Sequence, residues 1–201
     1  ERTVESTYDG KGNALTQDIT IKTAVLVGDD LPAVAIDAVT GNIVMPPANL
    51  LEYSEKQHVK NSNFTPRGNP RTTVTTTATY VPADGTKPAK WVLDSERTVN
   101  STYDGKGNAL TQDITTKTAV LVDGDLPEIV LVNDMIDMTA GKLPALEDSE
   151  KQHVVNSNFT PRGNPRTTVT TTASKDGAVW RLDSERTVES TYDGKGNALT
   201  Q

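Results

Sequence analysis

The sequence predicts an all-β fold made of two tandem sandwich-like units followed by a repeated terminal hairpin or strand segment. Three observations support this prediction. One segment of seventeen residues occurs three times, threonine and other β-branched residues are abundant, and turn motifs separate short alternating stretches. Aromatic residues make up only 4% of the chain, so valine, leucine and isoleucine must fill most of any interior.

The repeated segment reads ERTVESTYDGKGNALTQ and occupies residues 1–17 and 185–201. A third copy at residues 96–112 differs only by Asn100 in place of Glu5. Recurrence at intervals near ninety residues indicates a repeated structural unit. We therefore predict repeat 1 over residues 1–95 and repeat 2 over 96–184. Residues 185–201 would then begin a third repeat and pack on a neighbouring module.

Each unit is expected to open with a β-hairpin. Residues 2–8 alternate in the way of a strand, and residues 9–13 (DGKGN) supply the glycine and asparagine that tight turns require. A second, longer strand is predicted over residues 14–27.

The middle of the unit is expected to be mixed. The pattern predicts short strands over 33–37 and 42–45, a short helix over 48–58 after two prolines, and a strand over 58–64. A rigid turn (PRGNP) over 66–70 then precedes a strongly alternating strand over 71–81, a loop over 82–90 and a last strand over 91–93. Asp94 and Ser95 are expected to connect that strand to the next copy.

About seven short strands per unit are typical of an immunoglobulin-like β-sandwich. The second unit repeats the pattern, with a loop before Trp180 that is shorter than the loop before Trp91. Each tryptophan is expected to pack in its own unit. At the level of pattern, the units resemble tandem immunoglobulin-like modules of adhesins and surface fibres.

The stretch TYDGKGNALTQ is similar to the YD-repeat of Rhs-type and related large bacterial surface and secreted proteins. Tyr8, Asp9, Gly12, Asn13 and Leu15 fit that pattern, and the other two copies fit it equally. The resemblance covers about eleven residues per unit and implies a β-hairpin in a secreted protein.

The two units differ most between their matched ends. Residues 28–53 and 123–148 align without gaps but share few residues. One interpretation is that residues 33–53 and 128–148 form ligand- or glycan-binding surfaces. The other is that each segment packs on a different neighbour or has simply drifted.

Composition narrows the possible functions. A net charge of −7 argues against nucleic-acid partners and anionic membranes, and no apolar run is long enough for a membrane span. The chain has no cysteine, so disulfides and thiolate metal sites are excluded. No catalytic motif recurs, and an enzyme is not expected. We expect an extracellular or cell-surface location.

Candidate ligand and modification sites are weak. Acidic turns containing Asp29, Asp30, Asp123 and Asp125 could donate oxygens to Ca²⁺, but their spacing fits no EF-hand, and acidic turns are usually only solvated. No cofactor is otherwise expected. His58 and His153 occupy equivalent positions without a nearby second histidine, so surface or capping roles are expected. Glycosylation sequons occur at Asn63, Asn100 and Asn158.

The surplus third copy suggests how such chains associate. A lone hairpin is marginally stable in water, so the extra copy must pack on something. We predict a structural repeat of an extracellular filament or surface adhesin that binds further copies of itself head-to-tail through shared or donated strands. The residues expected to take part are Arg2, Val4, Tyr8, Arg186, Val188, Tyr192 and Leu199.

Overall fold

The computed structural model describes residues 1–26, 31, 35–37, 39–40, 42, 44 and 50–200. The prediction of an all-β fold is confirmed, since the described residues form strands and turns and contain no α-helix. Of the short strands expected over 33–37 and 42–45, residues 35–37, 42 and 44 are described. The Asp37 amide donates to the Asn42 carbonyl and the Val44 amide donates to the Ala35 carbonyl, both at 2.9 Å, so these described residues pair with one another.

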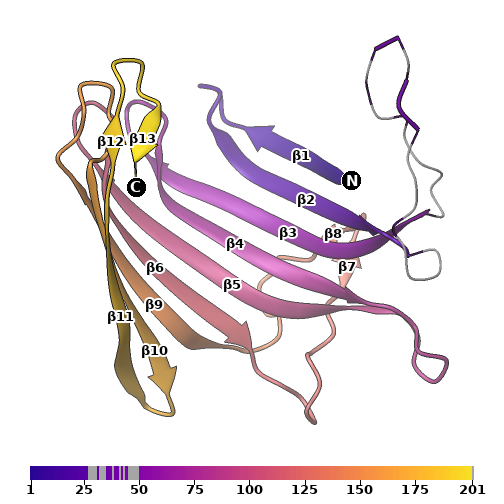
Figure 1. Cartoon of the computed structure of the whole chain (residues 1–201). Coiled ribbons are helices and arrows are strands. Elements are labelled where there is room, and N and C mark those ends of the chain that lie inside the picture. The colour runs from indigo at the N-terminus through magenta and orange to yellow at the C-terminus, as the bar shows by residue number, and fades with distance from the viewer. Residues whose placement is uncertain are drawn as a thin grey trace.

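Among the described residues, nine strands form one antiparallel sheet in which sequential strands lie side by side (Figure 1). The strands are β1 (Arg2–Tyr8), β2 (Ala14–Ala24), β3 (Leu51–Phe64), β4 (Pro70–Val81), β5 (Lys90–Tyr103), β6 (Ala109–Ala119), β9 (Leu146–Ser157), β10 (Thr167–Asp176) and β11 (Val179–Glu189). Two small pairs accompany the sheet: β7 (Leu131–Val132) with β8 (Met135–Ile136), and β12 (Thr191–Tyr192) with β13 (Ala198–Thr200).

Strand β5 runs through the boundary between the two repeats. Residues 90–93 end repeat 1 and residues 96–103 begin repeat 2, yet they form one strand. Its residues pair with β4 on one side, and residues 95–103 pair with β6 on the other. The boundary near residue 184 likewise falls inside β11. The repeats are thus joined in one sheet, an arrangement different from the two separate sandwiches that the strand count suggested.

The break expected at Asp94 and Ser95 is a β-bulge. Leu93 pairs with Ala78 and Ser95 pairs with Thr77, so Asp94 is left without an opposite residue. A bulge accommodates one extra residue while the strand continues. The same irregularity occurs in β11, where Leu182 and Ser184 flank the unpaired position.

The helix predicted over residues 48–58 is wrong where it is described, because residues 51–58 belong to β3. Helix-forming residues such as Glu55, Lys56 and Gln57 alternate between the two faces of the sheet and pair with strands on both sides. Pairing and packing against neighbouring strands outweigh the local helix propensity of this stretch. The predicted strand over 58–64 is the second half of the same element.

The turn and the strand ends beside it adopt the same conformation in all three copies, although the first strand of the third copy is interrupted at Ser190, between β11 and β12. Asp9 closes the first turn: its carboxylate accepts hydrogen bonds from the Lys11 and Asn13 amides at 2.8 and 2.9 Å, and from Asn13 Nδ2 at 2.7 Å. Asp104 and Asp193 make the corresponding bonds in the second and third copies. The hairpin expected from the YD-like residues is therefore present in every copy.

The hydrophobic core lies at the junction between repeats. Its buried members are Ala78 and Leu93 from repeat 1 and Ala119, Ile129 and Ile136 from repeat 2. Trp91 packs against this cluster of residues from both repeats, whereas the Trp180 ring centroid lies 4.6 Å from Lys151 Nζ. A single sheet cannot bury a face by itself, and residues 126–146 provide the second layer.

The turn aspartates predict how the fold responds to acid. Hydrogen bonds from Asn13, Asn108 and Asn197 hold the pKa values of Asp9, Asp104 and Asp193 below the usual 3.8. Because the folded-state pKa is depressed, the stabilisation is fully present above pH 3.8 and is lost as the pH falls through the folded-state pKa. Thermal unfolding followed by circular dichroism should show the melting temperature falling below about pH 4.

The variant Asp104→Asn tests this explanation. We expect a lower melting temperature at pH 7 and a shallower decline below pH 4, since one titrating turn is removed. Melting curves whose acid dependence runs parallel to that of the parent chain would contradict the assignment.

Candidate functional site

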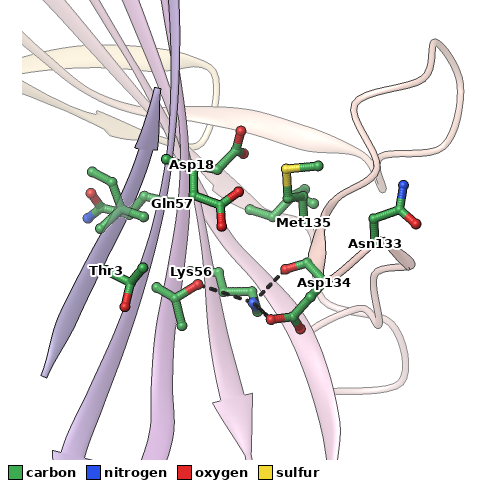
Figure 2. Close-up of a pocket in the computed structure, with 11 residues that line it drawn as sticks. Thr3, Asp18, Lys56, Gln57, Asn133, Asp134 and Met135 are labelled. Carbon is green, nitrogen blue, oxygen red and sulfur yellow. Dashed lines mark hydrogen bonds and ion pairs between the residues drawn. The ribbon is translucent and has the colours of Figure 1, made fainter. Parts of the chain in front are cut away.

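Polar and apolar side chains of both repeats contact one another at the junction between the repeats. At its centre, Lys56 of β3 lies under the β7–β8 hairpin of repeat 2 (Figure 2). Lys56 Nζ donates to the Asp134 carbonyl at 2.5 Å and to Thr20 Oγ1 at 3.2 Å, and it lies 2.9 Å from the Asp134 carboxylate. The Lys56 side chain is 3% exposed, whereas that of Asp134 is 65% exposed.

Burial of an ammonium group is costly unless its donors are satisfied. Here the three oxygen contacts match the three donors of the Lys56 ammonium. The faces of Tyr53 and Trp91 also lie near it, each with its ring centroid 5.4 Å from Nζ. The cost of burying the Lys56 ammonium is therefore offset only when the hairpin of repeat 2 is in place.

The hairpin turn presents Asp134 to the lysine. Asn133 and Asp134 have φ values of 51° and 63°, the left-handed conformation that two-residue hairpin turns favour. Asparagine and aspartate tolerate this conformation better than other non-glycine residues. The turn directs both the carbonyl and the carboxylate of Asp134 towards Lys56.

Residues just before this hairpin extend the sheet edge. The Leu93 amide donates to the Pro127 carbonyl at 2.9 Å, and the Ile129 amide donates to the Trp91 carbonyl at 3.0 Å. These bonds lie on the edge of β5 beyond the end of β6. Repeat 2 thus binds repeat 1 both along its strand edge and across its face.

A small cavity remains beside the ion pair. It has a volume of about 50 Å³ and is lined by residues from β1, β2 and β3 and by residues 133–136 (Figure 2). Sites for small organic ligands usually have volumes of several hundred Å³, so this space suits water better than a ligand. The contact is a packing interface with little free room.

The tight turns at one end of the sheet form a second set of contacts between repeats. Arg67 Nε donates to the Gly105 carbonyl at 3.1 Å, and Asn69 Nδ2 donates to the Gly107 carbonyl at 3.2 Å. In the opposite direction, the Tyr103 hydroxyl donates a hydrogen bond to the Pro70 carbonyl at 3.0 Å. The PRGNP turn of repeat 1 is therefore hydrogen-bonded to the DGKGN turn near the start of repeat 2.

The same three bonds recur where the third copy begins. Arg162, Asn164 and Tyr192 bond to Gly194, Gly196 and Pro165 at 3.1, 3.1 and 3.0 Å. Tyr8 occupies the corresponding position in the first copy and is 62% exposed. The contact is thus a repeated feature wherever one unit follows another in the described chain.

The residues expected to donate strands lie on the two edge strands of the nine-stranded sheet, β1 and β11, and on the separate pair β12–β13 (Figure 1). Arg2, Val4 and Tyr8 lie on β1, where they pair with Ile21, Ile19 and Ala14. Arg186 and Val188 lie on β11, Tyr192 on β12 and Leu199 on β13. Each copy is paired with strands of its own chain, and none of these segments is an isolated tail.

The weak calcium candidates are placed as follows. Asp29 and Asp30 lie outside the described residues. Asp123 and Asp125 belong to a tight turn, and the Asp125 carboxylate lies 3.2 Å from Lys87 Nζ. The part of the chain that the structure describes contains no group of three or more acidic, histidine or cysteine side chains suited to a metal ion.

The histidines have partners that the sequence did not reveal. His58 Nδ1 lies 2.8 Å from the Asp18 carboxylate, and His153 Nδ1 lies 2.6 Å from the Asp113 carboxylate. Each aspartate lies on the adjacent strand, forty residues earlier. Each pair joins opposite residues of two neighbouring strands, and so helps to fix the register of β2 with β3 and of β6 with β9.

Sequence reasoning also missed Lys56, Asp134, Arg67 and Asn69. Two signals were available: a lysine that recurs at the equivalent position of both units, Lys56 and Lys151, and a turn whose arginine and asparagine recur in both units. Neither signal identifies the partner, because the contacts join residues far apart in the chain.

No protein-family model matches this chain, and no curated protein is detectably similar to it. Within the described residues, no helix is long and apolar enough to cross a membrane.

The Lys56–Asp134 contact should matter more than exposed ion pairs. We expect Asp134→Ala to lower the free energy of unfolding by about 2 kcal/mol, because it deprives a buried ammonium of its charged partner. Asp125→Ala is the matched control: its ion pair with Lys87 is exposed on both sides, so we expect a change below about 1 kcal/mol. Denaturant titration monitored by tryptophan fluorescence measures both, and equal effects would contradict the importance of burial.

The turns predict a contrast between two glycines with the same backbone conformation. Gly68 and Gly85 both have φ of +84°. A Cβ at Gly68 would collide with the Asn13 side chain, which is held by its bond to Asp9, whereas a Cβ at Gly85 meets nothing within 4 Å. Both alanine variants incur about 1 kcal/mol for the left-handed conformation, and Gly68→Ala should lose about 1 kcal/mol more. Equal losses in denaturant titration would show that the turns do not pack as described.

Proposed function

We propose that this chain is a structural repeat of an extracellular filament or surface adhesin that extends head-to-tail through shared β-strands. The observation that carries the proposal is β5, one strand that closes repeat 1 and opens repeat 2. Its backbone bonds on both edges give a direct template for joining further units.

The ends of the sheet are suited to such growth. β1 and β11 are its outermost strands, and each is paired on one side only among the described strands. Open strand edges readily pair with another chain. Since one edge belongs to the start of a unit and the other to its end, contacts between them are head-to-tail and generate open filaments.

The identity of the two terminal copies supports strand donation. In the internal copy, Val99 of β5 pairs with Ile114 of β6, and in the first copy Val4 of β1 pairs with Ile19 of β2. Val188 of β11 occupies the same position in the third copy. If β11 of one chain replaces β1 of the next, Val188 will face Ile19 in an unchanged register.

The alternative, a ligand- or glycan-binding surface on residues 33–53 and 128–148, receives less support. Residues 129–136 are largely committed to the junction, and the cavity beside them is small. Much of 33–53 lies outside the described residues. The resemblance to surface-protein repeats supports an extracellular location, and the acidic composition is compatible with an exposed protein.

Self-association tests the proposal. We expect chains refolded from denaturant at high concentration to form a ladder of oligomers, because intermolecular donation competes with internal pairing only while β1 is released. Sedimentation velocity measures the size distribution. Monomers alone, at every refolding concentration, would contradict head-to-tail assembly.

A peptide of residues 1–17 provides the specificity control. Since the same residues recur at 185–201, the free peptide should occupy the acceptor edge of β2 and shorten the oligomers. A scrambled peptide of the same composition should leave the distribution unchanged. Equal inhibition by both peptides would indicate nonspecific association.

A further inference from the structure

The row of residues that receives repeat 2 on the face of repeat 1 has a counterpart on repeat 2 itself. In repeat 1, Thr20, Lys56, Ala78 and Leu93 lie opposite one another across β2, β3, β4 and β5. In repeat 2, the same residue types form the same row across β6, β9, β10 and β11, namely Thr115, Lys151, Ala173 and Leu182. The chain therefore carries this acceptor row twice.

The two rows differ in what covers them. Leu93 is fully buried and the Lys56 side chain is 3% exposed, because the segment 126–138 of repeat 2 lies over them. Leu182 is 71% exposed and the Lys151 side chain is 49% exposed. Identical residue types in identical register are thus covered in one unit and open to solvent in the other.

In the solvent-exposed row of repeat 2, the lysine also lies near an aromatic ring. Lys151 Nζ lies 4.6 Å from the Trp180 ring centroid, as Lys56 lies near Trp91. Its nearest carboxylate, Asp148, is 3.9 Å away, and no described residue supplies the close pair of oxygens that Asp134 gives Lys56. The outer edge of β11 beside Leu182 is also unpaired among the described strands, whereas the edge of β5 beside Leu93 bonds to Pro127.

We propose that the open face of β9, β10 and β11 is a docking surface for the divergent segment of a following repeat unit. This inference rests on the proposed head-to-tail function and names the part of the next unit that binds. The occupant is the stretch equivalent to residues 126–138, whose hairpin turn would supply oxygens to Lys151 and whose apolar residues would cover Leu182. The reason is continuity: that segment already covers the matching row one unit earlier.

The surroundings of the row explain why these segments differ between units. Tyr53 and Tyr80 beside the row of repeat 1 correspond to Asp148 and Lys175 beside the row of repeat 2. A segment that packs against two tyrosines requires different side chains from one that packs against an aspartate and a lysine. The constant row therefore fixes where the next unit docks, and its variable surroundings select which segment fits.

A three-unit chain tests the inference directly. Residues 113–201 are appended after Gln201, which reproduces the natural Gln112–Asp113 junction, and Leu182→Cys is introduced in the first occurrence only. The parent chain has no cysteine, so thiol labelling reports this site alone. We expect labelling to slow by about tenfold or more relative to Leu182→Cys in the two-unit chain, because the docked segment must open before the reagent enters.

A second chain adds Asp148→Tyr and Lys175→Tyr in the first occurrence, which gives the acceptor face the surroundings found in repeat 1. Protection should be at least as strong there. A control carries Asp134→Ala and Ile136→Ala in the appended copy only, and its labelling should return towards the two-unit rate.

Unchanged labelling in both three-unit chains, while circular dichroism shows that the added strands have folded, would overturn the docking surface. That result would leave strand sharing intact. Failure of the added strands to fold on the sheet would instead contradict the proposed function and the docking surface together.

Discussion

Backbone hydrogen bonding on both edges of β5 is the constraint on which the rest of the structure depends. The strand belongs to two repeats at once, and the bulge at Asp94 lets it continue past the boundary. Because β4 and β6 are fixed to the same strand, the two repeats share one register. Every other contact at the junction, from the turns to the ion pair, is positioned by this shared register.

Packing follows the same logic. A sheet of one layer leaves a face exposed unless a second layer covers it. The described core combines Leu93 and Ala78 of one repeat with Ile129 and Ile136 of the next. The buried Lys56 favours a following repeat that supplies an acidic partner, because Asp134 of that repeat offsets the cost of burying the ammonium group. The junction is therefore the site of stabilisation, and the divergent segment is a structural part of it.

Local features were predictable from the sequence and long-range ones were not. The strands over 2–8 and 70–81 and the turns with Asp9 and Gly12 follow from alternation and turn chemistry, which act over a few residues. The helix predicted over residues 48–58 is wrong in its described part, residues 51–58, because cross-strand pairing determines that stretch. The bulge at Asp94, the histidine–aspartate pairs and the contact of Lys56 with Asp134 join residues that only the folded sheet brings together.

The identity of the pairings in successive copies has an evolutionary consequence. The same residue pair closes the hairpin in each copy: Tyr8 with Ala14, Tyr103 with Ala109 and Tyr192 with Ala198. An unequal crossover between neighbouring copies of the coding sequence would add or delete one whole unit in frame, and the crossover point would fall inside a hairpin turn that every copy forms. Array length can therefore change in single genetic steps while every remaining strand keeps its neighbours.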